Sequence, residues 1–445
     1  MYFRYSIYGL YCLFINVATA IGAGIAVMEH SVKELGQAFS GAPTNTKDGS
    51  VVFFNPAAMS HIKGRLFSFS GYVAIPSVQF SNNDSQLNPL LGVASLIGNN
   101  GGNAPRTALI PNFYYVHALS ERFSAGLGIS VPFGMQSNYH PDWVGRYQAI
   151  DSELATINFN PSASIKITER ISIGAGLNIQ YLESKLSNAI DFGSACFQIL
   201  EPLSCTSQDI LPQTADGRIS LKGNSIGLGY NVGIFYTPTS NTYFGASYRS
   251  KINHQVHSSA NFTVPENAMF LTQNNIFVDT SAKTSVTLPD HVLFGFLHRI
   301  GESWTISADA MWTRWSHIQV LRTQFSSAQP DDIQVLKWKN TWRYAIGVSY
   351  SPMVNQLTFR TGFAYDESPV PGPIYRSPRI PDSDRYWLTA GLSYAVLKNI
   401  ILHAAYAHLF INDASIDRGG TTGDRLTGKF SEHINIVGLQ LDWRF

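Results

Sequence analysis

Serine and histidine residues could in principle supply the nucleophile and the base of a hydrolytic site. Such a site needs a serine, a base and an orienting group held close together, and a chain with twelve histidines offers many chance combinations. No nucleophile elbow, Walker loop, zinc-ligand spacing or paired acidic motif rises above that chance level. We therefore expect no enzyme, no metal site and no cofactor, and interpret the chain as one that binds through noncovalent contacts.

Two cysteines predict a covalent cross-link. Cys196 and Cys205 lie in a segment that also contains Pro202 and several serines and threonines. In an exported protein this arrangement indicates a disulfide within a loop. Two free thiols are the alternative.

The N-terminus indicates export. Residues 1–20 combine Arg4 with an apolar stretch and end in Ala18-Thr19-Ala20, which resembles a signal-peptide cleavage site. We predict a secretory signal peptide over 1–20, with cleavage as late as residue 23 as a variant. A short buried strand or helix at the true N-terminus is the alternative.

The composition differs from that of an ordinary soluble protein. Only 14% of the residues are charged, 44% are hydrophobic, and the formal net charge is +1. About a quarter of residues are charged in typical soluble domains. Beyond the N-terminus no apolar run is long enough for a membrane-spanning helix, and no basic cluster suggests nucleic acid as a partner.

Strict alternation of apolar with small or polar residues explains the missing charge. From residue 171 to 181 the odd positions are apolar or aromatic, from Ile171 to Tyr181, and the even positions are Ser, Gly, Asn and Gln. A period of two predicts strands. Long strands with aromatic ends, an apolar face and a polar face are typical of a transmembrane barrel with a lipid-facing surface and a polar lumen. Lipid also requires the sheet to close, because an open edge would leave backbone groups unpaired.

The fold class predicted is all-β, a fourteen-stranded antiparallel transmembrane barrel over residues 65–445. Short links that alternate with long ones place both chain ends on the periplasmic side of an outer membrane. The last strand ends in Trp443 and Phe445, which resembles the signal read by the barrel assembly machinery. We expect strands near 65–79, 107–119, 122–134, 153–167, 170–188, 217–238, 242–262, 284–300, 303–320, 339–352, 355–366, 385–396, 399–411 and 431–445.

Residues 21–64 lack strand alternation and precede the first strand. A barrel of fourteen strands encloses a lumen wide enough to need a plug. We therefore expect this segment to fold inside the barrel as a hatch, which also argues against a general water-filled porin.

Several spaced motifs occur between about residue 24 and residue 445: Glu29-His30-Ser31-Val32, Leu35-Gly36-Gln37-Ala38-Phe39-Ser40-Gly41, Asn55-Pro56-Ala57, Trp312-Thr313-Arg314-Trp315-Ser316, Asn340-Thr341-Trp342-Arg343, Phe359-Arg360-Thr361-Gly362, Asp366-Glu367-Ser368-Pro369-Val370-Pro371 and Ile380-Pro381-Asp382-Ser383-Asp384-Arg385-Tyr386-Trp387-Leu388. With these motifs the chain resembles the FadL family of outer-membrane long-chain fatty acid transporters, which also contains aromatic-hydrocarbon channels. The resemblance implies passive uptake of a long-chain fatty acid or another hydrophobic small molecule by a monomer surrounded by outer-membrane lipid. A monoaromatic or alkane channel of the same family is the alternative, and a porin or an outer-membrane phospholipase is less favoured.

The resemblance also implies a gate. In the family an Asn-Pro-Ala turn, here Asn55-Pro56-Ala57, lies against an inward kink of the third strand, which opens a lateral gap in the wall. The predicted third strand contains Gly126, Gly128 and Pro132. Glycine often marks bulges and proline cannot donate to a ladder, so the kink is expected either at the two glycines or near the proline.

Candidate ligand-binding residues follow from the same comparison. Lys185 matches a basic position of the family, whereas Asn188 stands where a relative has an arginine. Arg322 and Lys337 are candidates for the carboxylate by location alone, and solvated loop charges are the alternative interpretation. Apolar residues of the first long loop are expected to capture the ligand first: Leu91, Val93, Leu96 and Ile97.

Overall fold

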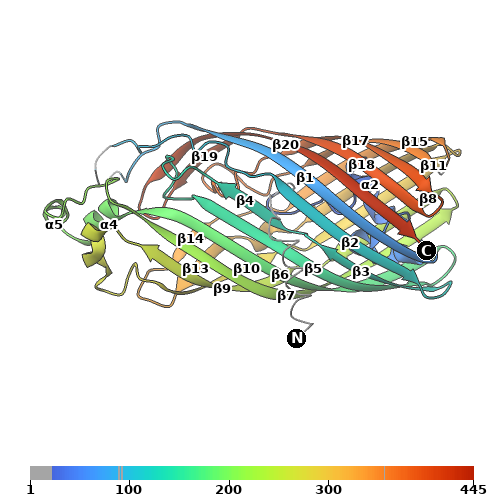
Figure 1. Cartoon of the computed structure of the whole chain (residues 1–445), viewed down its shortest axis with the longest axis horizontal. Helices are drawn as coiled ribbons and strands as arrows, with labels where there is room; N and C mark the ends of the chain where they lie inside the picture. Colours follow the sequence, from blue (N-terminus) through green and yellow to red (C-terminus); the bar gives the residue numbers. More distant parts are fainter. Residues whose placement is uncertain (1–22, 89–90, 92–93, 355) are drawn as a thin grey trace.

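The strands of the protein form an antiparallel sheet that closes into an elongated barrel (Figure 1). The computed structural model describes residues 23–88, 91, 94–354 and 356–445. Strand β1 (Arg65–Asn82) pairs with β2 (Ala108–Ala118) on one side and with β20 (Arg425–Arg444) on the other, which closes the sheet. Within the described ranges, no helix is long and apolar enough to cross a membrane. The predicted signal peptide lies outside the described residues, apart from its latest cleavage position.

Fourteen wall strands are present, as predicted, but six of them consist of two consecutive segments. These six are β3 with β4, β8 with β9, β10 with β11, β12 with β13, β14 with β15, and β18 with β19. The segments not yet given are β3 (Phe123–Ser130), β4 (Gly134–Asn138), β5 (Asp151–Lys166), β6 (Ile171–Asp191), β7 (Asp216–Thr239), β8 (Thr242–Arg249), β9 (Ile252–Thr263), β10 (Thr280–Leu288), β11 (His291–Ile300), β12 (Trp304–Thr313), β13 (Val320–Phe325), β14 (Asp332–Val335), β15 (Thr341–Met353), β16 (Leu357–Asp366), β17 (Arg385–Leu397), β18 (Ile400–Ile411) and β19 (Ala414–Gly419).

The breaks correct the uninterrupted strands predicted over 242–262, 284–300 and 303–320, whereas the break within 122–134 lies near Pro132, one of the two positions expected for a kink. Pro132 and Pro289 lie in two of the breaks, and proline has no N–H to donate to a ladder. In a third break the backbone N–H of Tyr230 donates to the hydroxyl of Ser250 at 2.9 Å, so a side chain replaces a ladder contact. Alternation alone does not reveal such breaks, because it continues on both sides of them.

Alternating faces of the strands give the barrel an apolar outer belt. On β7 the outward side chains from Ile226 to Tyr236 are all apolar or aromatic and 40–71% exposed, whereas Asn231 and Phe235 on the inner face are buried. Ten residues of strand extend about 33 Å, or about 25 Å in height at the usual strand tilt. This matches the hydrocarbon layer of an outer membrane.

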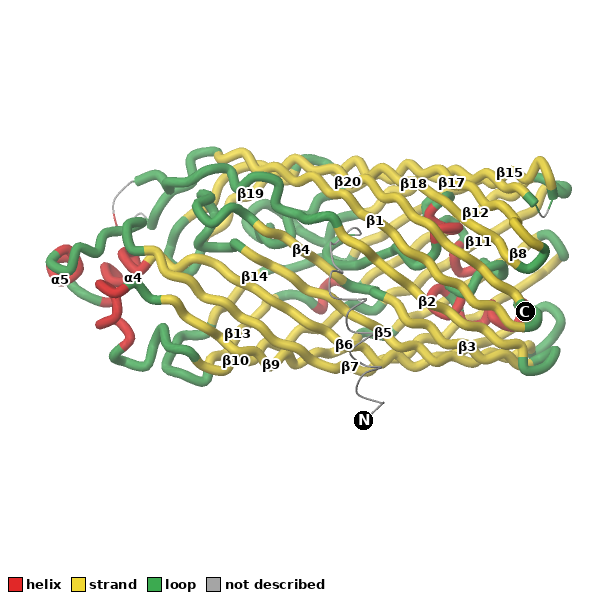
Figure 2. The backbone as a smooth tube through the Cα atoms, viewed as in Figure 1, coloured by secondary structure: helices red, strands yellow, loops and turns green. Residues whose placement is uncertain are grey.

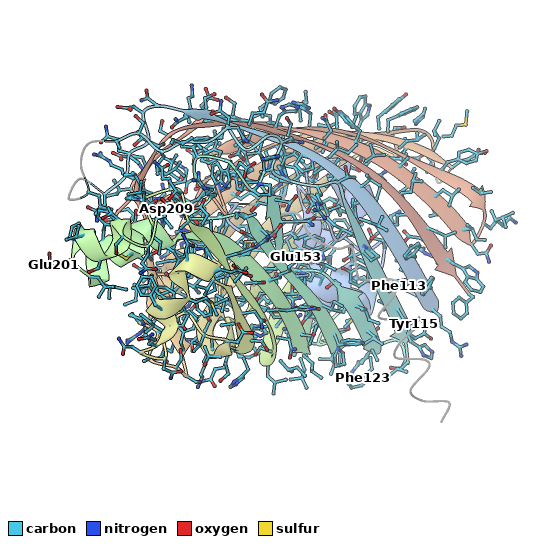
Figure 3. All side chains as sticks on the ribbon, turned by 60° about the vertical axis from the view of Figure 1, so that its left-hand side comes forward. Phe113, Tyr115, Phe123, Glu153, Glu201 and Asp209 are labelled. Atoms are coloured by element: carbon cyan, nitrogen blue, oxygen red, sulfur yellow. A yellow bond between two sulfur atoms is a disulfide. The ribbon has the colours of Figure 1, made fainter. Side chains whose placement is uncertain are left out.

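The two ends of the barrel differ. Short turns and the C-terminus lie at one end, which the predicted topology makes periplasmic, while the opposite end, called the outer end below, carries α4 (Phe192–Ile199) and α5 (Pro202–Thr206) (Figure 1). A disulfide bond joins Cys196 in α4 to Cys205 in α5. Figure 3 shows Glu201 and Asp209 at the outer end, and Phe113, Tyr115 and Phe123 along the wall at the other. Loop segments of the outer half also form the 3-10 helices η4 (Glu266–Thr272) and η5 (Trp315–His317).

The N-terminal segment folds inside the barrel, as predicted. It forms α2 (Val32–Leu35), η1 (Ala42–Thr44), α3 (Val51–Phe54) and η2 (Pro56–His61), and Figure 2 shows these short helices within the wall, towards the periplasmic end. Glycines of the wall let the hatch backbone approach closely. A Cβ atom at Gly362 would lie 2.2 Å from the carbonyl carbon of Gln37.

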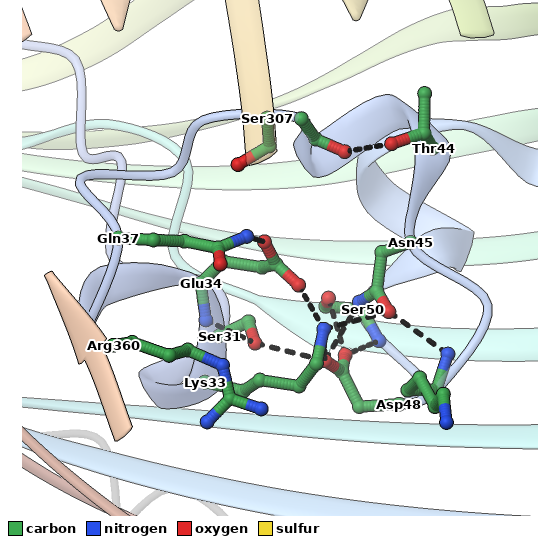
Figure 4. Close-up of polar contacts among 12 residues, drawn as sticks. Ser31, Lys33, Glu34, Gln37, Thr44, Asn45, Asp48, Ser50, Ser307 and Arg360 are labelled. Carbon is green, nitrogen blue, oxygen red and sulfur yellow. Dashed lines mark hydrogen bonds and ion pairs between the residues drawn. The ribbon is translucent and has the colours of Figure 1, made fainter. Parts of the chain in front are cut away.

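Polar contacts also fix the hatch to the wall and connect residues within the hatch, as Figure 4 shows for Lys33, Glu34 and Asp48. The hydroxyls of Ser40 and Ser307 are hydrogen-bonded at 2.7 Å, and the backbone N–H of Val32 donates to Gln440 Oε1 at 2.7 Å. Within the hatch Lys33 pairs with Glu34 and lies 3.8 Å from Asp48. Each such buried hydrogen bond contributes about 1 kcal/mol, so most of the hatch is a fixed part of the fold.

Candidate functional site

The wall is interrupted at Val131, Pro132 and Phe133, between β3 and β4. Up to Ser130, β3 pairs with both β2 and β5, whereas β4 pairs with β5 alone among the described strands. At the far end of β4 the backbone N–H of Asn138 donates to the carbonyl of Ala104 at 2.6 Å, so β4 contacts the segment that precedes β2. Between these two points, on the side that faces β2, the described part of the wall has no direct strand pairing.

Residues 23–27 of the hatch fill this interruption. The N–H of Val27 donates to the carbonyl of Pro132 at 3.0 Å, and the N–H of Gly134 donates to the carbonyl of Ile25 at 2.9 Å. Ala26 and Phe133 form an antiparallel bridge. The segment is also bound to the loop between β16 and β17, because the N–H of Gly24 donates to a carboxylate oxygen of Asp382 at 3.1 Å.

An apolar cavity, called the central cavity below, lies next to this segment, and Ile25 forms part of its lining. Its volume is about 100 Å³, so it is narrow. Arg379 alone is charged among the described residues that line it. The lining includes Ile25, Met135, Leu154, Leu182, Leu186, Leu221, Val256, Val286, Ile318, Leu321, Leu336, Trp338, Ile380 and Arg379.

Arg379 is held rigidly at the edge of the central cavity. Its Nη1 donates to the carbonyl of Asp151 at 3.0 Å and to the hydroxyl of Ser152 at 2.9 Å, and its Nη2 donates to Asn188 Oδ1 at 3.1 Å. Its Nε has no hydrogen-bond partner among the described residues. Burial lowers the pKa of Arg379 to about 10, so the guanidinium remains charged at neutral pH and retains one unused donor.

Two further cavities adjoin the central one at Arg379. The outer cavity, towards α4, is also lined by Leu186, Leu221, Arg379 and Asn188. The wall cavity, beside the interruption, is lined by Gly24, Met135, Ile380 and Arg379. Because Ile25 lines the central cavity and Gly24 lines the wall cavity, the segment 23–27 lies between a buried apolar space and the gap in the wall.

Three predicted carboxylate ligands do not enter these cavities. Lys185 on β6 and Arg322 on β13 are exposed and point out of the barrel, because they share the strand faces of Ile179 and Val320. Arg322 pairs with Asp331. Lys337 is exposed, and its Nζ lies 5.2 Å from the ring centre of Tyr375. These positions correct the expectation for all three.

Asn188 and Arg379 lie at the cavities instead. Asn188 lines the outer cavity, as its candidacy requires, and binds Arg379. Sequence reasoning missed Arg379 because it lies in the loop between β16 and β17, where no periodicity indicates direction. The available signal was its position directly before Ile380-Pro381 in a motif of the family.

The apolar residues of the first long loop have different environments. Leu96 is 5% exposed and packs in the cluster that contains Phe80 and Trp143, whereas Ile97 is 71% exposed. Leu91 is half-buried, and Val93 lies outside the described residues. Leu96 is therefore part of the core under the loop, which corrects its assignment to an exposed capture site.

The Asn55-Pro56-Ala57 turn lies against other strands than expected. Asn55 Nδ2 donates to the carbonyls of Pro43 and Ile234, at 2.9 and 3.0 Å, and a Cβ atom at Gly174 would lie 2.4 Å from the backbone nitrogen of Ala57. The turn thus contacts β6 and β7, and residues 25–27 contact the kink instead.

The two glycines of the third strand do not form the kink. Gly126 and Gly128 lie in the part of β3 that pairs without interruption. A Cβ atom at Gly126 would lie 2.5 Å from the sulfur of Met59 in η2. These glycines make room for the hatch, whereas Pro132 lies in the kink itself.

Replacing Asn55 by alanine is expected to loosen the hatch. Asn55→Ala removes two donated hydrogen bonds and the cap that Asn55 Oδ1 provides for the N–H of Ala57. We expect a loss of about 2 to 3 kcal/mol, measured as faster hydrogen exchange over residues 51–61. The exposed turn variant Asn399→Ala serves as the control. Unchanged exchange in Asn55→Ala would contradict an anchoring role.

A glycine-serine pattern in β7 does not form a hydrolytic site. Gly223, Ser225 and Gly227 have the spacing of a nucleophile elbow, but that motif requires a sharp turn from a strand into a helix. Here all three lie within one continuous strand. No hydrolytic site follows from this spacing.

Comparison with known proteins identifies the family. A family model described as outer membrane protein transport protein (OMPP1/FadL/TodX) matches residues 14–445. The chain belongs to this family. Members of the FadL/TodX family are outer-membrane transporters of hydrophobic compounds rather than enzymes, so the protein is an outer-membrane protein.

Relatives of the FadL/TodX family cover almost the whole chain. Outer membrane protein P1 of Haemophilus influenzae is 27% identical over 96% of both chains. The long-chain fatty acid transport protein of Escherichia coli K12 is 28% identical over 90% of both. The crystal structure of a Pseudomonas aeruginosa FadL homologue has a TM-score of 0.84 at 25% identity and covers 95% of this chain and 100% of that one. The Pseudomonas putida toluene transporter TodX, at 17% identity and a TM-score of 0.62 over 89% of this chain and 94% of its own, shares the fold.

Proposed function

We propose that the protein takes up long-chain fatty acids, which bind in the central cavity with the carboxylate at Arg379. One observation carries this proposal: an apolar cavity is bordered by a single buried guanidinium with a free Nε donor. Each buried methylene gains about 0.8 kcal/mol, and a charged donor suits a carboxylate. Relatives named as long-chain fatty acid transport proteins support the same substrate class.

An uncharged hydrocarbon fits the cavity less well. Toluene or an alkane would fill the apolar part but would leave the charged Nε of Arg379 without a partner. A buried donor that lacks a partner costs about 1 to 3 kcal/mol. The arrangement therefore favours an amphiphile with an anionic end.

The route that we propose has three stages. Ligand enters through the outer cavity, moves into the central cavity beside Arg379, and leaves sideways through the gap between β2 and β4. Exit requires residues 23–27 to move, because Ile25 and Gly24 separate the two inner cavities. Lateral exit keeps the alkyl chain out of water, and transport is passive.

Uptake into liposomes tests this function. Purified protein in liposomes is expected to transport oleate well above the rate of empty liposomes and above that of toluene, without sucrose leakage. Sucrose flux would show an open pore and contradict the proposal. Toluene uptake faster than oleate uptake would assign the protein to hydrocarbons instead. The double variant Asn55→Ala/Pro56→Ala shows whether uptake also depends on the anchored hatch.

A further inference from the structure

A group of basic residues lies on the outside of the barrel, above the apolar belt. Lys185 on β6, Lys222 on β7, His257 on β9 and Lys283 on β10 form this group, called the outer basic patch below. Figure 1 shows the four strands side by side as they approach the outer end. On β7, Ile226 is the last large apolar residue of the outward face, and Lys222 lies four residues beyond it. The outer basic patch is thus at the level of lipid head groups.

The charges of the outer basic patch are only partly balanced by the protein. Lys185 and Lys222 are directly opposite each other in the register of β6 and β7, an arrangement that is unfavourable without a counter-charge. Glu183 lies 3.7 Å from Lys222, and Glu153 on β5 is directly opposite Lys185 in the strand register. Neither Lys185 nor Lys283 has an ion-pair partner among the described residues.

Three other exposed basic residues of the outer half form ion pairs. Arg322 pairs with Asp331, Arg425 with Asp417, and Lys429 with Asp413. In the outer basic patch, by contrast, three lysines stand beside two carboxylates, Glu183 and Glu153. The remaining positive charge can attract an anion from outside the protein.

A polar hollow in the outer wall lies within the outer basic patch. Its volume is about 590 Å³, and Lys222, His257 and Lys283 line it together with Glu183 and the small side chains of Ser259 and Ser281. Gly223, which has no side chain, also borders it. Ammonium and hydroxyl groups around a hollow are suitable donors for phosphate oxygens.

We propose that the outer basic patch binds a phosphate group of the phosphorylated glycolipid in the outer leaflet. The height of the patch above the belt favours this lipid over free phosphate, because acyl chains against Ile226 and Leu228 would hold the phosphate group at the hollow. Basic residues near an anionic membrane surface each strengthen such binding. The site faces lipid and not the lumen, so it is independent of the proposed transport route.

Binding of purified lipid A tests this proposal. Detergent-solubilised protein and the triple variant Lys185→Gln/Lys222→Gln/Lys283→Gln are titrated with bisphosphorylated lipid A, with dephosphorylated lipid A and with inorganic phosphate. We expect the wild type to bind the bisphosphorylated lipid, and the triple variant to lose on the order of tenfold in affinity or more. Dephosphorylated lipid A and inorganic phosphate are expected to bind at least tenfold more weakly to the wild type.

Matched variants separate charge from folding. Lys429→Gln removes a paired cation of the outer face and should bind lipid A like the wild type, and Lys185→Arg/Lys222→Arg/Lys283→Arg should retain binding. Oleate uptake by the triple glutamine variant should remain unchanged, which also shows that it is folded. Equal affinity of wild type and triple glutamine variant, or equal binding of dephosphorylated lipid A, would overturn the proposal. Equally tight binding of inorganic phosphate would mean a simple anion site without a role for the lipid.

Discussion

A disulfide between residues 26 and 133 is expected to stop fatty acid uptake. The double variant Ala26→Cys/Phe133→Cys joins the hatch segment to the kink at a position where the two residues already form an antiparallel bridge. Directly paired residues have Cα atoms about 4.5 to 5.5 Å apart, which suits disulfide geometry. Because the cross-link holds Ile25 and Gly24 between the inner cavities, oleate uptake in liposomes should fall to the rate of empty liposomes when the variant is oxidised and recover when it is reduced.

Two controls accompany the cross-link. The pair Leu177→Cys/Tyr230→Cys joins β6 to β7 on the outer face, where the strands are already paired, and it should transport oleate at the wild-type rate in both redox states. The wild type, treated with the same reductant, accounts for any effect on the bond between Cys196 and Cys205. Undiminished uptake by the oxidised 26–133 variant would show that ligand leaves by another route.

The hatch segment is well placed to move while the rest of the hatch stays fixed. Four hydrogen bonds hold residues 23–27: two to the kink, one from Ala23 to Asp366 and one from Gly24 to Asp382. At about 1 kcal/mol each, their sum is comparable with the gain from burying a few methylenes. On the proposed route, a ligand that presses on Ile25 would therefore displace this segment.

Strand alternation predicted the barrel because lipid outside and a polar lumen inside impose opposite demands on successive residues. The same rule would have excluded Lys185 as a carboxylate ligand in the lumen. Ile173, Leu177 and Ile179 share the outward face of β6, and Lys185 continues that face at the same parity. Its direction was thus available from the sequence, although its role as a carboxylate ligand was inferred from the family position.

Loop residues could not be placed in this way. Arg379 lies between β16 and β17 in a segment that folds back into the lumen, and its contacts are with Asp151, Ser187 and Asn188, which are far away in the sequence. Similarly, no local sequence pattern shows that residues 25–27, and not the turn at Asn55, lie against Pro132. Such contacts depend on how the closed barrel brings distant segments together.

Replacing Arg379 is expected to weaken fatty acid binding much more than binding of the corresponding ester. Arg379→Met keeps an apolar stem of similar length but removes the charge and the free Nε donor. Hydrogen bonds to charged groups contribute about 1.5 to 3 kcal/mol, so the affinity for oleate should fall roughly 10- to 100-fold. Methyl oleate, which has the same chain but no carboxylate, should lose little. Displacement of a fluorescent fatty acid from purified protein measures both ligands.

The comparison of acid and ester separates recognition from folding. Arg379 also donates to Asp151, Ser152 and Asn188, so a variant that disturbs the cavity would weaken acid and ester alike, and that result would make the residue structural. Arg379→Lys keeps the charge without the planar donor set and should bind oleate at an intermediate level, while Arg322→Met, which removes an outward-facing arginine, should bind like the wild type. Since burial lowers the pKa of Arg379 to about 10, oleate binding by the wild type should be constant near neutral pH and weaken as the pH rises through 10. The ester should show no such decline.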